Sequence, residues 1–535
     1  MPHAMIVAPQ PEAVEAGALV LMRGGNAVDA AMAAALVQGV VDPMMCGIAG
    51  FGSMQVYLPK RGVHHCIDFH GRSPAATRPD MWADRIIGET RDGFGFILAG
   101  NVNDVGYQSI TVPGSLKAYY EAQTEWGAWD WRDVVAPAIK EADAGFIVKP
   151  HVHFFWSQTD QLGRVANPDR LRHTAAGRRI FCDQDGNPHG LGARVAMPDM
   201  AQTLRRIQAE GADVFYKGSI AQEVAADMAR HGGLLTQDDL AHYRTTRIDP
   251  LWGSYRGLKL ATNNPPGGGI TLIEMLNILE NFDLAGLGHN TPAYIRIVAE
   301  AMKCATADKD AHVGDPAFVD VPVARLTDKA YAKQLADGIR AGRKAHVARV
   351  ERAKETADTP DIAVVDRDGN AVTMTHSLGM PSGVVTEGLG FMYNGCMGVF
   401  DPRPGRAGSM APGKSRYSSL CPTIVFKGGQ RHIIIGAPVG ALISVGVLQA
   451  ILNVVDFDMD MQDAVSAPRF AATSNAIDVM NRIPAYVTDE LAKEGYEIVR
   501  SPLSYGIAAV HGIRIDGERL QGGADPGHDG MALMV

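Results

Sequence analysis

The sequence predicts an α+β protein in which a helix-rich first two-thirds precedes a sheet-rich last third. Helical patterns recur from residue 10 to residue 341, whereas β-branched and apolar runs dominate from residue 362 onward. Between them, the stretch 342–361 is polar and charged, which predicts an exposed tether. These three observations together indicate a layered fold rather than a repeat or a bundle.

The helical region opens with an Ala-rich pattern over 10–42. Two glycines followed by Asn26 divide it, which is typical of one helix end and a new helix start. A glycine-rich turn over 47–52 leads into a strand at 53–58, and its spacing differs from that of a dinucleotide-binding loop. Further helices are predicted at 115–127, 197–210, 219–231, 270–283, 294–312 and 329–341.

The sheet-rich region opens with a hairpin signal around Asp368-Gly369, flanked by the runs 362–366 and 371–377. Pairing about this turn places residues 377–378 opposite 359–360. A one-residue change of register would turn each side chain to the other face, so the pattern predicts proximity without fixing a contact. Further strands are predicted at 389–393, 421–426 and 431–435, with a helix at 439–454.

Composition excludes several function classes. The 535 residues are 46% hydrophobic and 20% charged, as in an ordinary globular protein. The net charge of −9 and the lack of a basic block argue against a nucleic-acid partner. The sequence contains no run of about 18 apolar residues, the length needed to span a membrane, so no membrane span is predicted. The first residues lack a basic segment followed by an apolar one, so a cytoplasmic location is expected.

Metal and cofactor chemistry are not expected. The six cysteines form no C-x-x-C pair, which argues against a zinc site and a disulfide framework. His64-His65 and the pair His151 and His153 have no convincing third ligand nearby. A G-x-S-x-G elbow, an H-E-x-x-H motif and a P-loop are all missing from the sequence.

Thr359 stands where the polar stretch meets the hairpin. A threonine hydroxyl is a poor nucleophile without a base. A cut before this residue would free its own α-amine, with a pKa of about 7.7–8.0, to accept the proton. An isolated Thr-Pro pair is ordinarily a loop residue entering a strand, so the catalytic interpretation depends on the surrounding sequence.

That surrounding sequence resembles the γ-glutamyltransferase family of N-terminal nucleophile hydrolases, from about residue 5 to the end. The matching segments occur in the family's order, which makes the resemblance specific. They are Gly24-Gly-Asn-Ala-Val-Asp-Ala-Ala31, Thr111-Val-Pro-Gly114, Pro265-Pro-Gly-Gly-Gly269, Glu274-Met-Leu-Asn-Ile-Leu279, Asp308-Lys-Asp-Ala-His-Val-Gly-Asp315, Tyr417-Ser-Ser-Leu-Cys-Pro-Thr423, Gly436-Ala-Pro-Val-Gly440, Ala467-Pro-Arg469 and Gly523-Ala-Asp-Pro526.

The resemblance implies a four-layer αββα sandwich and a precursor that cuts itself between Asp358 and Thr359. In that reaction the Thr359 hydroxyl attacks the Asp358 carbonyl, and water hydrolyses the resulting ester. The products would be a large chain, 1–358, and a small chain, 359–535, folded as one composite domain. Whether two such heterodimers associate is left open.

The resemblance also assigns the catalytic residues. Thr359 is the nucleophile, Ser377 matches a second hydroxyl that assists it, and the backbone N–H groups of Val439 and Gly440 form the oxyanion hole. The family threonine is usually followed by Thr-His, whereas Pro360-Asp361 follows here. Proline leaves the Thr359 amine intact and favours extended geometry at that residue.

For the substrate carboxylate, the resemblance implies binding by the paired Ser418 and Ser419. An arginine of the family's D-F-R-E-x-A-P stretch is replaced here by His70, and Arg72 follows two residues later. On a strand, Arg72 would point to the same side as His70. Arg72 suits a carboxylate better than His70 does, because its planar guanidinium can donate two parallel hydrogen bonds to the two carboxylate oxygens.

The family's amine-binding positions are altered. Gly379, Cys396 and Val399 stand where the family has an asparagine, a glutamine and a carboxylate that pairs with a substrate ammonium. An ammonium without its anionic partner is unfavourable in a closed pocket. The altered pocket suits an amide that bears a carboxylate and lacks an α-amine, such as oxamate or a dicarboxylic monoamide.

Three functional hypotheses follow from these residues. The first is a self-cleaving amidohydrolase that acts on such a small amide. The second is a true γ-glutamyltransferase or glutathione hydrolase. The third is an uncleaved relative without catalysis, which Pro360 and Val439 would support.

Overall fold

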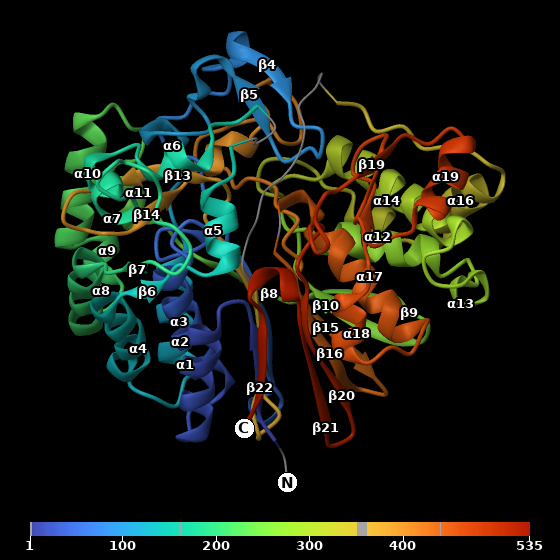
Figure 1. Cartoon of the computed structure of the whole chain (residues 1–535), viewed down its shortest axis with the longest axis horizontal. Coiled ribbons are helices and arrows are strands. Elements are labelled where there is room, and N and C mark those ends of the chain that lie inside the picture. Colours follow the sequence, from blue (N-terminus) through green and yellow to red (C-terminus); the bar gives the residue numbers. More distant parts are fainter. Residues whose placement is uncertain (1–2, 160–162, 350–360, 439) are drawn as a thin grey trace.

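Two β-sheets lie face to face at the centre of the protein, and helices cover their outer faces (Figure 1). The structure is a computed structural model and describes residues 3–159, 163–349, 361–438 and 440–535. Side chains of both sheets form a shared apolar layer that includes Val7, Ala363, Ile424 and Ile434. This layer removes apolar surface of both sheets from water and holds them together.

The first sheet combines strands from both ends and from the middle of the chain. In spatial order they are β22 (Met531–Met534), β1 (Met5–Ala8), β11 (Asp361–Val365), β12 (Ala371–Ser377), β2 (Phe51–Leu58), β3 (Val63–Phe69) and β8 (Thr246–Ile248). Each neighbouring pair runs antiparallel. The predicted hairpin is the pair β11 and β12, in which Asp361 lies opposite Thr375.

The second sheet is likewise antiparallel. Its strands, in spatial order, are β21 (Arg519–Ala524), β20 (His511–Asp516), β16 (Gln430–Gly436), β15 (Thr423–Lys427), β10 (Leu258–Thr262) and β9 (Leu251–Tyr255). Short pairs complete the strands: β4 (Ile86–Glu89) with β5 (Phe96–Leu98), β6 (Phe146–Ile147) with β7 (Arg194–Val195), β13 (Pro381–Val385) with β14 (Met392–Asn394), and the group β17 (Phe470–Ala471), β18 (Ile477–Val479) and β19 (Ile498–Arg500).

The helices of the first half of the chain pack on the outer face of the first sheet and on one another. They are α1 (Pro11–Met22), α2 (Ala27–Val41), α3 (Ser115–Trp126), α4 (Trp131–Ala144), α5 (Pro150–Trp156), α6 (Asn167–Leu171), α7 (Ala175–Phe181), α8 (Pro198–Glu210), α9 (Asp213–Tyr216), α10 (Ser219–Arg230) and α11 (Gln237–His242). Asn26 caps α2 in a capping box with Asp29, and every residue of this Ala-rich helix is buried.

The later helices form the fourth layer, on the outer face of the second sheet. They are α12 (Gly269–Leu279), α13 (Leu284–Leu287), α14 (Pro292–His312), α15 (Val323–Leu326), α16 (Lys329–Arg340), α17 (Ile443–Val455), α18 (Met461–Ser466) and α19 (Ala485–Lys493). No helix in the described ranges is both long and apolar enough to cross a membrane. Figure 1 places the β4–β5 hairpin at the top, between the two halves.

Most predicted elements are confirmed, and the helix-rich region also contributes strands to both sheets. Each sheet takes strands from both regions: β2 and β3 lie in the first sheet, and β9 and β10 in the second. The helix predicted at 439–454 begins at Ile443, after a 3-10 turn at 440–442. Sequence patterns report local preference, whereas the place of a strand in a sheet also depends on distant partners, such as β12 for β2 and β15 for β10.

Candidate active site

Three strand ends meet at one place between the two sheets. β11 begins at Asp361, β12 ends at Ser377, and β16 ends at Gly436. A β-carbon on Gly436 would lie 2.1 Å from Asp361 Oδ1, so only glycine fits against this carboxyl group. Thr359 precedes this start of β11 and lies outside the described residues, as do Asp358 and Val439.

Asp361 is a buried carboxyl group that sequence reasoning did not identify. Thr375 Oγ1 donates a hydrogen bond of 2.6 Å to its Oδ1, and Oδ2 has no hydrogen-bond partner in the described ranges. Burial raises the pKa of this carboxyl well above its usual value, and hydrogen bonds from Thr375 and the Ile362 amide oppose the rise. The protonated form is therefore more favoured than for an ordinary aspartate.

Ser377 is buried at the end of β12. Its Oγ accepts a hydrogen bond of 2.8 Å from the amide of Gly379, whose φ of +70° is in the region that favours glycine. On its other side Ser377 pairs with Phe51 of β2. Ser377 thus lies two residues beyond Thr375, which pairs with the first residue of β11, Asp361. Its proximity to residue 359 stays a prediction.

Gly440 begins the turn that leads into α17, and its φ of +49° again favours glycine. A β-carbon here would lie 3.0 Å from the ring of Phe94. Phe94 comes from the turn between β4 and β5, so that hairpin packs against the proposed oxyanion loop. No sequence pattern pointed to Phe94.

His70 and Ser418 are brought together, with Asp68 behind them. His70 Nε2 lies 2.5 Å from Ser418 Oγ, and His70 Nδ1 lies 2.6 Å from Asp68 Oδ1. Burial acts to raise the pKa of the Asp68 carboxyl, but the charge of His70 and its hydrogen bonds outweigh burial and hold that pKa below its usual value. The result is a carboxylate–imidazole–hydroxyl chain that orients Ser418. Ser419 Oγ lies 3.4 Å from the hydroxyl of Tyr417.

Arg72 is not part of that chain. Its guanidinium lies 5.5 Å from the ring centre of Tyr243, and Nη2 lies 3.4 Å from Thr246 Oγ1. The expectation that Arg72 and His70 share a side assumed a continuous strand, whereas β3 ends at Phe69. A role of Arg72 in binding substrate stays a prediction.

The three altered amine-binding positions gather around Arg416 and Phe94. A β-carbon on Gly379 would lie 3.2 Å from Cys396 Sγ and 3.7 Å from Arg416 Nη2. Val399 packs against Phe94 in a small apolar cluster. Burial raises the pKa of the Cys396 thiol to about 11, and Arg416 opposes the rise. The thiol is therefore neutral near pH 7.

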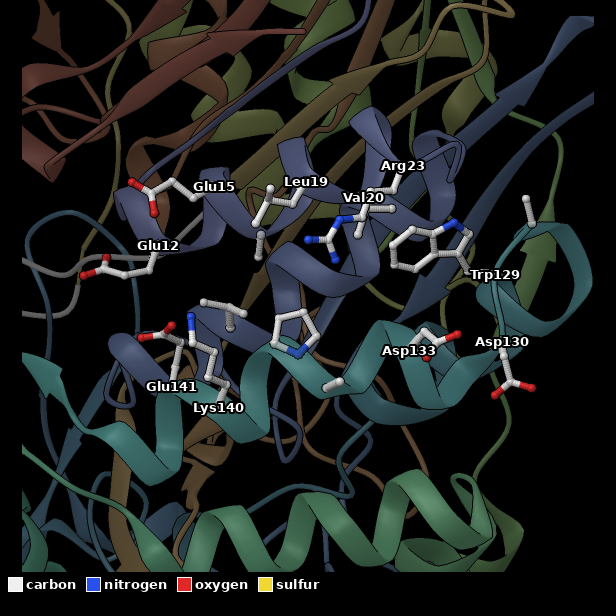
Figure 2. A pocket seen from close by; sticks show the side chains of 15 residues that line it. Glu12, Glu15, Leu19, Val20, Arg23, Trp129, Asp130, Asp133, Lys140 and Glu141 are labelled. Carbon is white, nitrogen blue, oxygen red and sulfur yellow. The ribbon is translucent and has the colours of Figure 1, made fainter.

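A cavity of about 860 Å³ opens elsewhere, on the outer helical layer between α1 and α4 (Figure 2). Figure 2 shows Glu12, Glu15 and Glu141 toward one end, and Asp130 and Asp133 toward the other. None of the residues predicted for catalysis or substrate binding lines this cavity. Within the described ranges, no group of three His, Cys, Asp or Glu side chains is arranged to hold a metal ion.

Sequence reasoning thus missed Asp68, Phe94, Asp361 and Arg416. A signal existed for Asp68, since it lies two residues before His70 near the end of a strand. Arg416 lies two residues before the paired serines. The others become neighbours of the site only through contacts between distant segments.

Comparisons with known proteins agree over the whole fold. The family model described as Gamma-glutamyltranspeptidase matches residues 13–535. The Acylase ACY 1 proenzyme of Pseudomonas sp. (strain SE83) is 36% identical to this chain, with 99% of this chain and 93% of that protein covered. The Glutathione hydrolase proenzyme of Bacillus subtilis (strain 168) is 33% identical, with 99% of this chain and 91% of that protein covered.

Among solved structures, cephalosporin acylase from Bacillus halodurans superposes with a TM-score of 0.87 at 27% identity. The match covers 99% of this chain and 96% of that chain. The four-layer fold that the resemblance implied is confirmed by this match and by the two facing sheets.

Proposed function

Because the chain belongs to the gamma-glutamyltranspeptidase family, we propose that its nucleophile is Thr359, freed by a cut after Asp358. The observation that carries this proposal is the meeting of three strand ends, where β11 begins beside Ser377 and Gly436. Two of the similar proteins are proenzymes, which supports a self-cleaving precursor.

In the proposed reaction, the residues at these strand ends act one after another. Continuing the register of β11 and β12 by two residues would set Thr359 opposite Ser377. The Thr359 hydroxyl attacks the amide carbonyl while its α-amine accepts the proton. The N–H groups of Val439 and Gly440 stabilise the oxyanion. The C–N bond then breaks, the proton passes to the leaving amine, and water hydrolyses the ester on Thr359.

The cut would leave chains 1–358 and 359–535 held together by shared sheets. β1 and β2 of the first segment pair with β11 and β12 of the second. In the second sheet, β10 pairs with β15. Separating the chains would therefore break backbone pairing in both sheets, so we propose that they persist as a heterodimer.

The substrate that we propose is a small amide with a carboxylate and no α-amine, such as oxamate or a dicarboxylic monoamide. The positions Gly379, Cys396 and Val399 provide no carboxylate for a substrate ammonium. The similarity to an acylase supports this choice. A glutathione hydrolase is the second candidate, which the similarity to the Bacillus subtilis protein favours.

The mass of the purified, denatured protein tests the proposed nucleophile. We expect two species whose boundary lies between Asp358 and Thr359, in place of one 57.2 kDa chain. The new amino terminus would then be confirmed by sequencing the small chain. A single uncut mass that stays constant on long incubation would contradict the proposal.

Replacing Ser377 with alanine should slow self-cleavage or amide turnover by about 10²-fold, the usual contribution of a positioned proton-transfer group. The fold should persist, because the hydroxyl accepts only a local hydrogen bond from Gly379 among the described residues. Rates of both steps would be followed by gel and by product release. Thr373→Val, on the same face of β12, is the matched control. Unchanged rates in both steps would remove the proposed role.

A further inference from the structure

Arg416 is a buried cation, and no carboxylate among the described residues pairs with it. Its side chain is 2% exposed, and Nε and Nη1 have no hydrogen-bond partner in the described ranges. The guanidinium lies 4.2 Å from the ring centre of Phe51 and 5.7 Å from that of Phe94. Burial lowers its pKa, and the groups that oppose this are Cys396 and Tyr417, whose ordinary forms are neutral. A buried guanidinium in such surroundings is strongly unfavourable unless something else pairs with it.

Two other buried arginines show how this protein normally handles such a group. Arg170 is paired with Asp104 at 2.5 Å and donates to the carbonyls of Val165 and Pro381. Arg469 pairs with Asp525 and also donates to backbone carbonyls. In the part of the chain that the structure describes, Arg416 has neither a carboxylate nor a backbone carbonyl as partner, and only the Cys396 thiol forms a hydrogen bond with it. This is the arrangement expected of a group that receives a ligand.

Arg416 lies close to the proposed reaction centre, so a ligand bound to it would stand where the acyl group of the substrate binds. Its Nη2 would lie 3.7 Å from a β-carbon on Gly379, whose amide donates to Ser377 Oγ. Phe51, on which the guanidinium stacks, pairs directly with Ser377. The guanidinium and the proposed reaction centre are thus separated by about one side chain. An acyl group that spans this gap must be short.

A second guanidinium reinforces the positive potential. Arg164 is half-buried, lies 4.9 Å from the ring centre of Phe94, and has no hydrogen-bond partner for Nη2 among the described residues. Burial lowers the pKa of Arg164, and the carboxyl groups of Asp104 and Asp92 act to raise it. Asp104 is, however, already paired with Arg170. Two guanidinium groups, those of Arg164 and Arg416, thus lie near the ring of Phe94, where the resemblance implies an acidic residue.

We propose that Arg416 binds a carboxylate at the far end of a short acyl group, so that this pocket selects a dicarboxylic monoamide and rejects an acyl group with an ammonium. The inference rests on the proposed function for its chemistry. The planar fork of arginine suits a carboxylate, which can accept two parallel N–H bonds. An ammonium at the same place would face a like charge. Arg416 thus replaces Arg72 as the main anion-binding residue of the site.

Three p-nitroanilides of similar size test the charge preference: succinyl, butyryl and β-alanyl. They present a carboxylate, a methyl group and an ammonium at the same position. We expect kcat/KM for the succinyl compound to exceed the other two by about 100-fold, as for a desolvated charge pair. Arg416→Gln should remove this preference, mainly by raising KM for the succinyl compound. Equal rates for all three compounds in wild type would overturn the inference.

Calorimetric and thermal titration with succinate provide a readout that does not depend on turnover. Succinate should bind wild type and raise its Tm, and should do neither in Arg416→Gln. Without ligand, Arg416→Gln should melt at the same temperature as wild type or above it, because an uncompensated buried charge is removed. Arg416→Lys, which keeps the charge but loses the fork, should bind more weakly. Arg296→Gln, an exposed arginine paired with Glu494, is the matched control.

The outcomes separate the two proposals. A chain that neither cuts itself nor hydrolyses any anilide contradicts the proposed function, while succinate binding that depends on Arg416 would still support the anion site. A self-cleaved enzyme that binds succinate equally with and without Arg416 overturns the anion site alone. Loss of succinate binding in Arg72→Ala, with full binding in Arg416→Gln, would place the carboxylate at Arg72.

Discussion

Replacing Thr359 with alanine should leave a single uncut chain of 57.2 kDa that hydrolyses no amide. The hydroxyl is proposed both to open the peptide bond after Asp358 and to form the acyl-enzyme, so one substitution removes two reactions. Loss of a nucleophile in a covalent mechanism lowers turnover by about 10⁴-fold or more. Intact mass measures the first reaction, and product release from an amide measures the second.

Two further variants make this result specific. Thr359→Ser keeps a hydroxyl and should retain slow cleavage and turnover. Thr356→Ala changes another threonine of the same polar stretch and should behave as wild type. A Thr359→Ala protein that still appears as two chains, or that hydrolyses amides at an appreciable fraction of the wild-type rate, would contradict a nucleophile at this position.

The sequence was sufficient for those elements whose signals are local. The helices on either side of Asn26 follow from a cap and two Ala-rich periodic segments, and the structure shows that cap. The hairpin of β11 and β12 follows from alternating β-branched residues around Asp368-Gly369. Strands β9 and β10 were not predicted. They pair with each other locally, but β10 joins the sheet through β15, which lies far along the chain.

The residues of the candidate site also fall into two groups, those in continuous motifs and those brought together only by folding. Motif order identified Ser377, Gly440 and Ser418, because the resemblance fixes those positions within continuous segments. Phe94 reaches Gly440 from a separate hairpin, and Arg416 reaches Gly379 from another loop. These contacts depend on tertiary packing. Motif comparison predicted an altered pocket at positions 379, 396 and 399, whereas only the fold revealed the guanidinium of Arg416 near Gly379 and Cys396.

Replacing Arg469 with methionine should cause the largest loss of stability among single substitutions in the second sheet's helical layer. Arg469 and Asp525 are fully buried and paired, and both belong to segments that resemble family markers. Arg469 also donates from Nε to Ile507 O at 2.9 Å and from Nη2 to Ala508 O at 2.6 Å. Its removal leaves a buried carboxylate and unpaired carbonyls. We expect the free energy of unfolding to fall by about 3–5 kcal/mol.

Urea unfolding would measure this loss, and a double-mutant cycle with Asp525→Asn would isolate the pair. Once Asp525 is neutral, the Arg469→Met substitution should be less damaging, because no unpaired charge remains buried. Arg500→Met removes a more exposed arginine that also donates to backbone carbonyls, and its effect should stay near 1 kcal/mol. Since Ala508 packs against Gly446 of α17, which follows directly after the proposed oxyanion loop, the damaged variant should also lose activity before it unfolds. A stability change in Arg469→Met no larger than that in Arg500→Met would show that the buried pair does not hold these segments together.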